Sequence, residues 1–177
     1  MFTMLTTPRL TLRRFRLDDL PALRAYRTDP DVARFQNWGD QNDETDLRRF
    51  VEEMQTRAPL EGLQIAVAMR STDALIGDLY IRGSSEAQAE IGYTFARPHQ
   101  GHGYATEAVV GLLNYCFKEL QLHRVIAIAA VENTASWHLM ERAGIRREAH
   151  MLQSYRYRGV WHDEYQYAIL QAEWRGF

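Results

Sequence analysis

Two glycines that flank a histidine, Gly101 and Gly103, are the residues of this sequence that point most directly to chemistry. They follow a stretch of alternating polarity and precede a long helical pattern, so the sequence predicts a strand-to-helix loop. Glycine lets the backbone approach a ligand closely, and free amide groups at a helix start attract an anion. A pyrophosphate suits this loop, although the same glycines would also serve a plain tight turn. The candidate segment comprises Gln100, Gly101, His102, Gly103, Tyr104, Ala105 and Thr106.

Other residue types that often carry chemistry give no comparable signal. Cys116 is the single cysteine and lies on the apolar face of the long helical pattern, which favours an inert buried thiol. His99 and His102 have no third candidate ligand nearby, so we expect no metal site. The sequence holds neither the G-x-S-x-G motif of hydrolases nor the G-x-x-x-x-G-K-[ST] phosphate loop.

Length and composition are those of one soluble domain. Of the 177 residues, 46% are hydrophobic and 25% are charged, values typical of globular proteins. The net charge of −2 and the lack of a basic stripe argue against a nucleic-acid partner. The longest apolar run, residues 125–131, is too short to cross a membrane, and residues 1–10 show no signal-peptide pattern. We expect a single cytoplasmic domain over residues 1–177, with no nucleic-acid or membrane partner.

The elements that must position the glycine loop follow from the hydrophobic periods, which are two for strands and 3.6 for helices. Short turns predict an antiparallel meander, and the strand–helix–strand order around the loop predicts a parallel pair in the middle of the sheet. The continuous apolar run 125–131 predicts a strand buried on both faces. The expected class is a mixed α/β domain, with strands at 9–13, 64–69, 75–81, 87–95, 125–131, 146–155 and 161–170, and helices at 18–29, 47–54, 103–120 and 133–143.

The glycine loop also fits a known family motif. Gln100, Gly103 and Ala105 match the pattern Q/R-x-x-G-x-G/A, so the loop resembles that of the GCN5-related N-acetyltransferases (GNAT). Further matches resemble the RimJ/RimL-type branch of this family and cover nearly the whole chain in order. They comprise residues 7–13, 90–95, 101–108, 133–136 and 141–144, with a looser match at Gly159, Trp161, Asp163 and Tyr165.

The resemblance implies a single GNAT-like domain with about four helices. Its central sheet would have six or seven mostly antiparallel strands, with parallel middle strands that splay apart. The implied co-substrate is acetyl-coenzyme A, with its pyrophosphate on the amides of the glycine loop. The pantetheine arm is expected between the splayed strands, on main-chain groups of Thr94, Phe95 and Ala96 and on the side-chain amide of Asn133. From the residues alone, Asn133 is also well suited to capping the helix that follows it.

The implied reaction is direct transfer of acetyl from the thioester to an amine. It requires a neutral amine, an oxyanion stabiliser and a proton for the leaving thiolate. Glu90 is the candidate general base or water-orienting carboxylate; the alternative is an ordinary polar residue on the flank of a strand. Where many relatives have a tyrosine acid, this chain has Met140, which cannot donate a proton. The resemblance moves that role to Ser136, one helical turn earlier.

Two other interpretations stay open at the level of sequence. A Rossmann dinucleotide-binding domain also has glycines between strand and helix, but the preceding meander and the lack of a second βαβ half argue against it. The other alternative is a non-catalytic coenzyme-binding module of the same fold, because Met140 replaces the tyrosine.

The acceptor amine is not specified by these motifs. A protein N-terminus, a polyamine and a small-molecule amine all remain candidates. The acidic residues before the second helix form either a solvated loop or an attraction for a cationic amine; they are Asp40, Asp43, Glu44 and Asp46. The last predicted hairpin, with Trp161, offers a surface for a homodimer.

Overall fold

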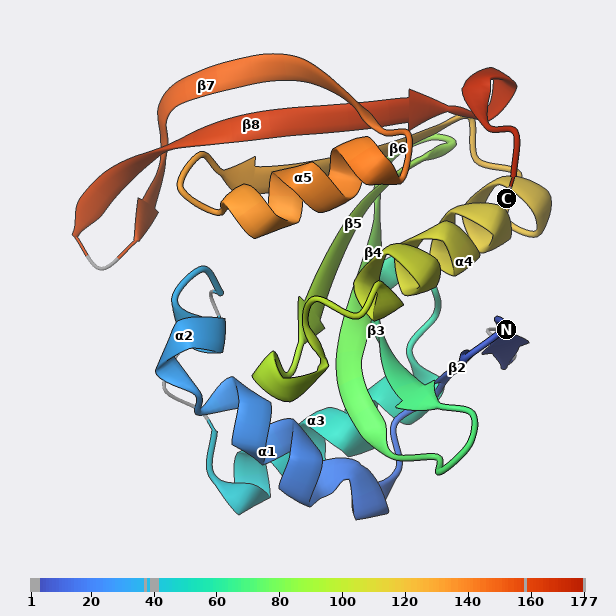
Figure 1. Cartoon of the computed structure of the whole chain (residues 1–177), viewed down its shortest axis with the longest axis vertical. Coiled ribbons are helices and arrows are strands. Elements are labelled where there is room, and N and C mark those ends of the chain that lie inside the picture. Colours follow the sequence, from blue (N-terminus) through green and yellow to red (C-terminus); the bar gives the residue numbers. More distant parts are fainter. Residues whose placement is uncertain (1–3, 37, 39–41, 158, 177) are drawn as a thin grey trace.

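The structure is a computed structural model that describes residues 4–36, 38, 42–157 and 159–176. In these residues one sheet of eight strands carries five α-helices (Figure 1). The strands are β1 Leu5–Thr6, β2 Leu10–Arg13, β3 Glu61–Met69, β4 Leu75–Ser85, β5 Gln88–Phe95, β6 Arg124–Ala130, β7 Arg146–Tyr157 and β8 Val160–Leu170. The helices are α1 Leu20–Arg27, α2 Pro30–Ala33, α3 Glu44–Thr56, α4 Tyr104–Lys118 and α5 Thr134–Arg142.

The sheet has the strand order β1-β2-β3-β4-β5-β6-β8-β7. All neighbouring pairs are antiparallel except β5 and β6, which confirms the predicted meander and the predicted parallel pair. The sheet has one strand more than expected. The additional strand is β1, in which Leu5 and Thr6 pair with Leu12 and Thr11 of β2. Two residues are too few to show an alternating pattern in a sequence.

The helices also exceed the expected number by one. Asp29 and Pro30 were expected to end the first helix, but they begin the short helix α2. The Asp29 carboxylate accepts a hydrogen bond from the Asp31 amide at 3.0 Å, and Pro30 occupies the first helical position. Both are standard features of a helix start. None of the described helices is long and apolar enough to cross a membrane.

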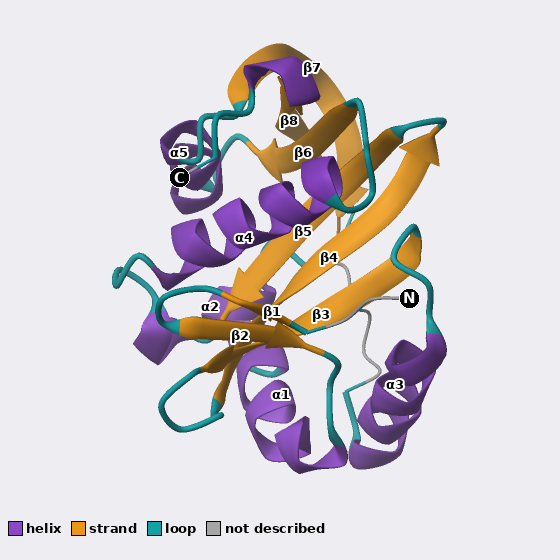
Figure 2. Ribbon diagram, turned by 90° about the vertical axis from the view of Figure 1, so that its right-hand side faces the viewer, coloured by secondary structure: helices purple, strands orange, loops and turns teal. Residues whose placement is uncertain are grey.

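Helices cover both faces of the sheet, as neighbouring residues of β2 show. Leu12 is fully buried under α4, where its side chain lies beside Gly111. Arg13 points to the opposite face and forms a buried ion pair with Asp19, at 2.7 Å, just before α1. Helices α1 and α3 contact β4 and β3, whereas α4 lies across β2, β4 and β5 (Figure 2). The first residues of α4 are thereby fixed at the end of β5.

The prediction that residues 125–131 are buried on both faces is wrong. Val125, Ala127 and Ala129 of β6 are buried, but the residues that alternate with them are only partly buried. The partly buried face includes Ile128, which lines a cavity instead of packing under a helix. The apolar residues of β6 therefore have two roles. Those on one face are buried in the core, and Ile128 on the other face lines a cavity.

Candidate functional site

Strands β5 and β6 separate directly after Glu90. The parallel register consists of three pairs, Gln88 with Arg124, Ala89 with Val125, and Glu90 with Ile126. Beyond Glu90, β5 remains paired with β4 only, so the edge of residues 91–95 that faces β6 has no strand partner among the described residues. This confirms the expected splay and leaves backbone groups available along the opening.

The glycine loop ends in a row of backbone amides that donate to no described residue. Gly101 and Gly103 have φ values of +77° and +80°, a region that other residues seldom adopt. The first bonded amide of α4 is that of Glu107, which donates to the Gly103 carbonyl at 3.1 Å. No hydrogen bond between described residues uses the amides of residues 101–106. Together with the helix dipole, these donors suit a phosphate group.

A brace from the turn between β1 and β2 holds the start of α4. The Arg9 side chain donates to Glu107 at 2.6 Å and to the His102 carbonyl at 3.0 Å. Thr7 donates to the other carboxylate oxygen of Glu107 at 2.5 Å. Burial alone would raise the pKa of Glu107, but the hydrogen bonds from Thr7 and Arg9 outweigh burial and lower it. Glu107 is therefore a fixed anion that ties the N-terminal strand to the glycine loop.

A cavity of about 580 Å³ follows the glycine loop and the open edge of β5; we call it the loop cavity. Gln100 also shapes it, because its side-chain amide donates to the Phe95 carbonyl at 2.9 Å. Most of the predicted binding residues meet here. The loop cavity is lined by Thr94, Phe95, Gln100, Gly101, Gly103, Tyr104, Ala105, Thr106, Asn133 and Ser136, together with residues of α2 and α5.

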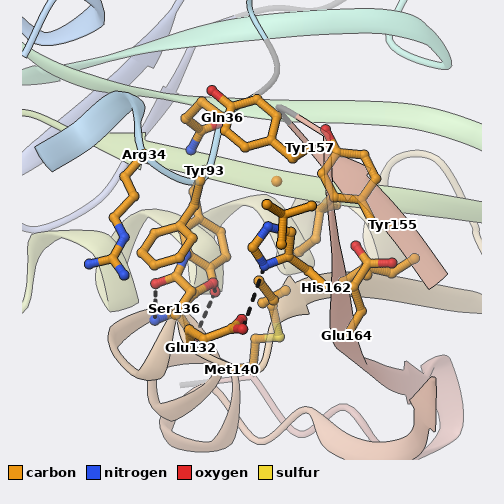
Figure 3. Close-up of a pocket in the computed structure, with 18 of the residues that line it drawn as sticks. Arg34, Gln36, Tyr93, Glu132, Ser136, Met140, Tyr155, Tyr157, His162 and Glu164 are labelled. Carbon is orange, nitrogen blue, oxygen red and sulfur yellow. Dashed lines mark hydrogen bonds and ion pairs between the residues drawn. The ribbon is translucent and has the colours of Figure 1, made fainter. Parts of the chain in front are cut away.

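A second cavity, of about 510 Å³, lies between β5, β6 and the β7–β8 hairpin; we call it the hairpin cavity (Figure 3). Its wall is mixed. Apolar residues include Ile91, Ile128, Met140 and Val160, and polar or charged residues include Arg34, Glu132, Tyr155, Tyr157, His162 and Glu164. A cavity with an apolar wall and a few polar groups is suited to a small organic molecule.

The two cavities meet at a neck that includes Tyr93, Asn133 and Ser136, which line both; Phe35 and Gln36 line both as well. The Tyr93 hydroxyl donates to the Ser136 carbonyl at 2.8 Å and lies 2.9 Å from the Ser136 hydroxyl. Burial raises the pKa of Tyr93 above its ordinary value, so the phenol stays protonated at neutral pH. Both hydroxyls can therefore supply or relay a proton at the neck.

Asn133 caps α5, which confirms one of its two interpretations, and its coenzyme-binding role stays a prediction. Its side-chain oxygen accepts the Ser136 amide at 3.3 Å and so caps α5. Its side-chain nitrogen has no partner among the described residues, and the residue lines both cavities. The cap fixes the amide group and leaves two N–H donors for a ligand.

Three predicted site residues lie outside both cavities. Glu90 sits where β5 and β6 are still paired, and its carboxylate is 3.9 Å from the Arg82 guanidinium. The Ala96 amide donates to Ile76, and its carbonyl accepts from His99, so both of its main-chain groups are engaged. His102 is exposed, and its ring stacks on Tyr104 at 5.8 Å. The catalytic role of Glu90 stays a prediction that this position does not favour.

The acidic residues before the second helix are used locally. Asp43 caps α3 by accepting the Asp46 amide at 2.9 Å. Asp46 pairs with Arg49, and Glu44 lies 3.8 Å from Arg48. None of these three carboxylates lines either cavity, and Asp40 lies outside the described residues. The solvated-loop interpretation thus fits the described members of the cluster.

Cys116 is an ordinary structural residue. The Cys116 side chain is fully buried on α4, and burial raises its pKa to about 12. Among the described residues, no group of three or more His, Cys, Asp or Glu side chains is placed to hold a metal ion.

Several residues that the fold brings to the site were not predicted from the sequence. Tyr93 was included only as part of the matching segment 90–95, and its partner Ser136 is 43 residues away. His162 and Glu132 come from β8 and from the turn after β6, where no motif marked them. Arg9 and Glu107 each lie in a matching segment, but their pairing spans 98 residues. No local pattern signals such contacts.

Comparisons with known proteins agree with this geometry. A family model described as an acetyltransferase (GNAT) domain matches residues 9–146. The uncharacterized N-acetyltransferase YnaD of Bacillus subtilis (strain 168) is 36% identical over 171 residues, which cover 96% of this chain and 98% of the relative. The spermidine N(1)-acetyltransferase of Vibrio cholerae is 35% identical over 95 residues, 54% of this chain and 53% of the relative. The crystal structure of an acetyltransferase (GNAT family) from Bacillus anthracis has a TM-score of 0.85 at 33% identity, with 96% of this chain and 99% of that chain covered.

Proposed function

This chain belongs to the GNAT acetyltransferase family and is an N-acetyltransferase, and we propose that it binds its coenzyme in the loop cavity and its acceptor amine in the hairpin cavity. Members of this family use acetyl-coenzyme A, which supplies the acetyl group as an activated thioester. The observation that carries the proposal is the shared neck, since Tyr93, Asn133 and Ser136 line both cavities. Two substrates that enter from opposite sides would meet there.

The residues of the loop cavity fit the parts of the coenzyme. The free amides of residues 101–106 suit its pyrophosphate, because they combine several donors with the positive end of α4. The open edge of β5 at residues 91–95 suits the amide-containing arm, which can bind extended backbone through main-chain groups. The Phe95 carbonyl on this edge already accepts a hydrogen bond from the Gln100 side chain. The free side-chain nitrogen of Asn133 offers further donors at the neck.

The neck supplies the proton that the departing sulfur needs. Met140, in the position of the tyrosine acid of many relatives, is buried and has no proton to give. We assign the donor role to the Ser136 hydroxyl, with Tyr93 as the group that orients it and can replenish its proton through their 2.9 Å contact. A donor held at the reacting atoms is typically worth about 10²-fold or more in rate.

The hairpin cavity fits a cationic amine, because Glu132 and Glu164 line it and offset the charge of Arg34. The relative named as a spermidine N(1)-acetyltransferase supports a polyamine or another small amine as acceptor. Relatives named as ribosomal N-acetyltransferases support a protein N-terminus instead. Membership of the RimJ/RimL-type branch, a cytoplasmic location and a homodimer through the exposed Trp161 stay predictions.

Blocking each cavity separately tests this placement. Gly103→Val should weaken acetyl-coenzyme A binding by about 2 kcal/mol or more, because a β-branched side chain hinders backbone approach at the loop. Gly144→Val is the matched control, since Gly144 has a similar φ of +77° but lies outside both cavities. Calorimetry with acetyl-coenzyme A should show a loss of affinity for the first variant and not for the second.

Ala130→Phe should act on the other substrate. Ala130 lines the hairpin cavity and not the loop cavity, so a larger side chain there should raise the KM for the amine. The affinity for acetyl-coenzyme A should stay unchanged. A loss of coenzyme affinity in Ala130→Phe, with an unaltered KM for the amine, would contradict the placement.

A further inference from the structure

A histidine and a carboxylate lie together in the hairpin cavity, apart from the groups described at the neck. His162 is on β8, and its Nδ1 atom is 3.5 Å from the Glu132 carboxylate, in the turn that follows β6. Figure 3 shows the His162 ring projecting into the region between Ser136 and Tyr155. The contact of His162 with Glu132 uses Nδ1, and no hydrogen bond between described residues uses its Nε2 atom. One nitrogen therefore faces an anion, and the other is left for a ligand.

This arrangement favours one form of the imidazole. A proton on Nδ1 faces the Glu132 carboxylate, which leaves the lone pair of Nε2 available as a proton acceptor. The His162 side chain is 28% exposed, so a proton taken up there can pass on to solvent. The titratable and charged groups that face His162 across the cavity are Arg34, Tyr93, Glu132, Tyr155, Tyr157 and Glu164.

The other carboxylates are less suited to taking a proton from an amine. Glu164 already accepts a hydrogen bond from the Ser154 hydroxyl at 2.8 Å. Glu90 lies outside both cavities, beside Arg82. Ordinary carboxylates are also far weaker bases than histidine, whose ordinary pKa of about 6.5 lies near neutral pH.

We propose that His162, oriented by Glu132, is the general base that removes a proton from the acceptor ammonium group in the hairpin cavity. This assignment rests on the proposed placement of the amine in that cavity. The ammonium gives one proton to Nε2 of His162, and the freed lone pair forms the new N–C bond to the acetyl carbon. As the C–S bond breaks, the nitrogen loses a second proton and the sulfur gains one through the Ser136 hydroxyl. His162 then releases its proton to solvent, so the reaction yields amide, free thiol and one proton.

The dependence of kcat/KM on pH tests the assignment in the full chain. For a strongly basic aliphatic amine, kcat/KM of the wild type should rise with pH and level off well below the pH at which the amine is itself neutral. His162→Gln keeps a polar side chain of similar size but removes the base, so kcat/KM should level off only at the higher pH where the amine is itself neutral. The rate at neutral pH should fall about 10²-fold or more. A weakly basic amine, already neutral at the assay pH, should lose much less. Added imidazole should partly restore His162→Ala with the basic amine.

His150→Gln is the matched control. His150 lies on the same hairpin and also faces a carboxylate, with its Nε2 atom 3.1 Å from Asp163, but it lines neither cavity. Its pH profile should match that of the wild type. Calorimetry should show unchanged acetyl-coenzyme A affinity for both glutamine variants, which separates a lost base from a lost fold.

Two results overturn the assignment. One is a pH profile of His162→Gln that retains the wild-type rise at a similar rate. The other is a shift of the profile to higher pH in Glu164→Gln but not in His162→Gln, which would make Glu164 the base. The Ala130→Phe variant tests the placement of the amine independently of the His162 variants. An unaltered KM for the amine in Ala130→Phe would show that the placement is wrong, and the assignment of His162 would then lose its basis.

Discussion

The hydroxyl groups of Tyr93 and Ser136 lie 2.9 Å apart, and this contact joins strand β5 to helix α5 at the neck between two cavities. Tyr93 donates its own proton to the Ser136 carbonyl, so its orientation is fixed from the side of the helix. The Ser136 hydroxyl is then free to donate either to Tyr93 or to a substrate. The contact thus places a proton donor at the junction without the tyrosine that Met140 replaces.

Ser136→Ala should lower kcat about 10²-fold while the affinity for acetyl-coenzyme A changes little, because only a proton donated late in the reaction is lost. Tyr93→Phe should give a smaller loss, since Ser136 keeps its hydroxyl. Steady-state kinetics and calorimetry measure the two effects. Ser84→Ala, an exposed site on β4, is the control. Equal turnover of Ser136→Ala and wild type would move the donor role to another group.

Substitutions of Asn133 should separate capping from ligand binding. Asn133→Ser retains a good N-cap but removes the side-chain N–H donors, so we expect near-wild-type stability and weaker acetyl-coenzyme A binding. Asn133→Ala removes both functions and should also lower the free energy of unfolding by about 1 kcal/mol. Urea denaturation and calorimetry on the same samples provide the comparison. If coenzyme affinity fell only in the alanine variant, Asn133 would be a cap alone.

Glu107 should make stability depend on pH in the acid range. Its pKa is lowered in the folded protein, so its contribution is complete above the unfolded value, about 4.3, and is lost as pH falls through the lower folded value. The free energy of unfolding should therefore fall more steeply below about pH 5 in the wild type than in Glu107→Gln. At pH 7 the variant should be less stable by about 1.5–3 kcal/mol, the range for hydrogen bonds to charged groups.

A surface ion pair on α3 serves as the control for Glu107. Glu53 lies 3.3 Å from Arg57 at a side-chain exposure of 51%, and such exposed pairs contribute little. Glu53→Gln should follow the wild-type curve in urea denaturation from pH 3 to 7. Superimposable curves for Glu107→Gln and Glu53→Gln would show that the brace to Arg9 and Thr7 contributes no more than a surface pair.

Cys116→Ala should keep full activity. The thiol is buried, and its pKa of about 12 keeps it protonated at neutral pH, so it cannot act as a nucleophile. Some stability should be lost, because a small cavity replaces the sulfur. Turnover assays and denaturation curves test both parts. An acetyl group trapped on Cys116 during turnover would exclude direct transfer to the amine.

The sequence by itself determined those features that arise within one element or between neighbouring ones. The periods of two and 3.6 placed the meander of β3, β4 and β5 and the helix α4, because local alternation and burial coincide in regular elements. The strand–helix–strand order fixed the parallel pair, since crossover connections have one hand. The glycine loop followed from residue type, because Gly101 and Gly103 adopt φ values that favour glycine.

Only the tertiary structure decided which side chains meet. Alternation placed Glu90 and Thr94 on one strand face, but the point where β5 and β6 separate depends on their register, which left Thr94 in the loop cavity and Glu90 outside it. Tyr93 with Ser136, and His162 with Glu132, come together through contacts between distant segments. Packing of whole elements sets such contacts, and a local pattern carries no information about the neighbour across a cavity.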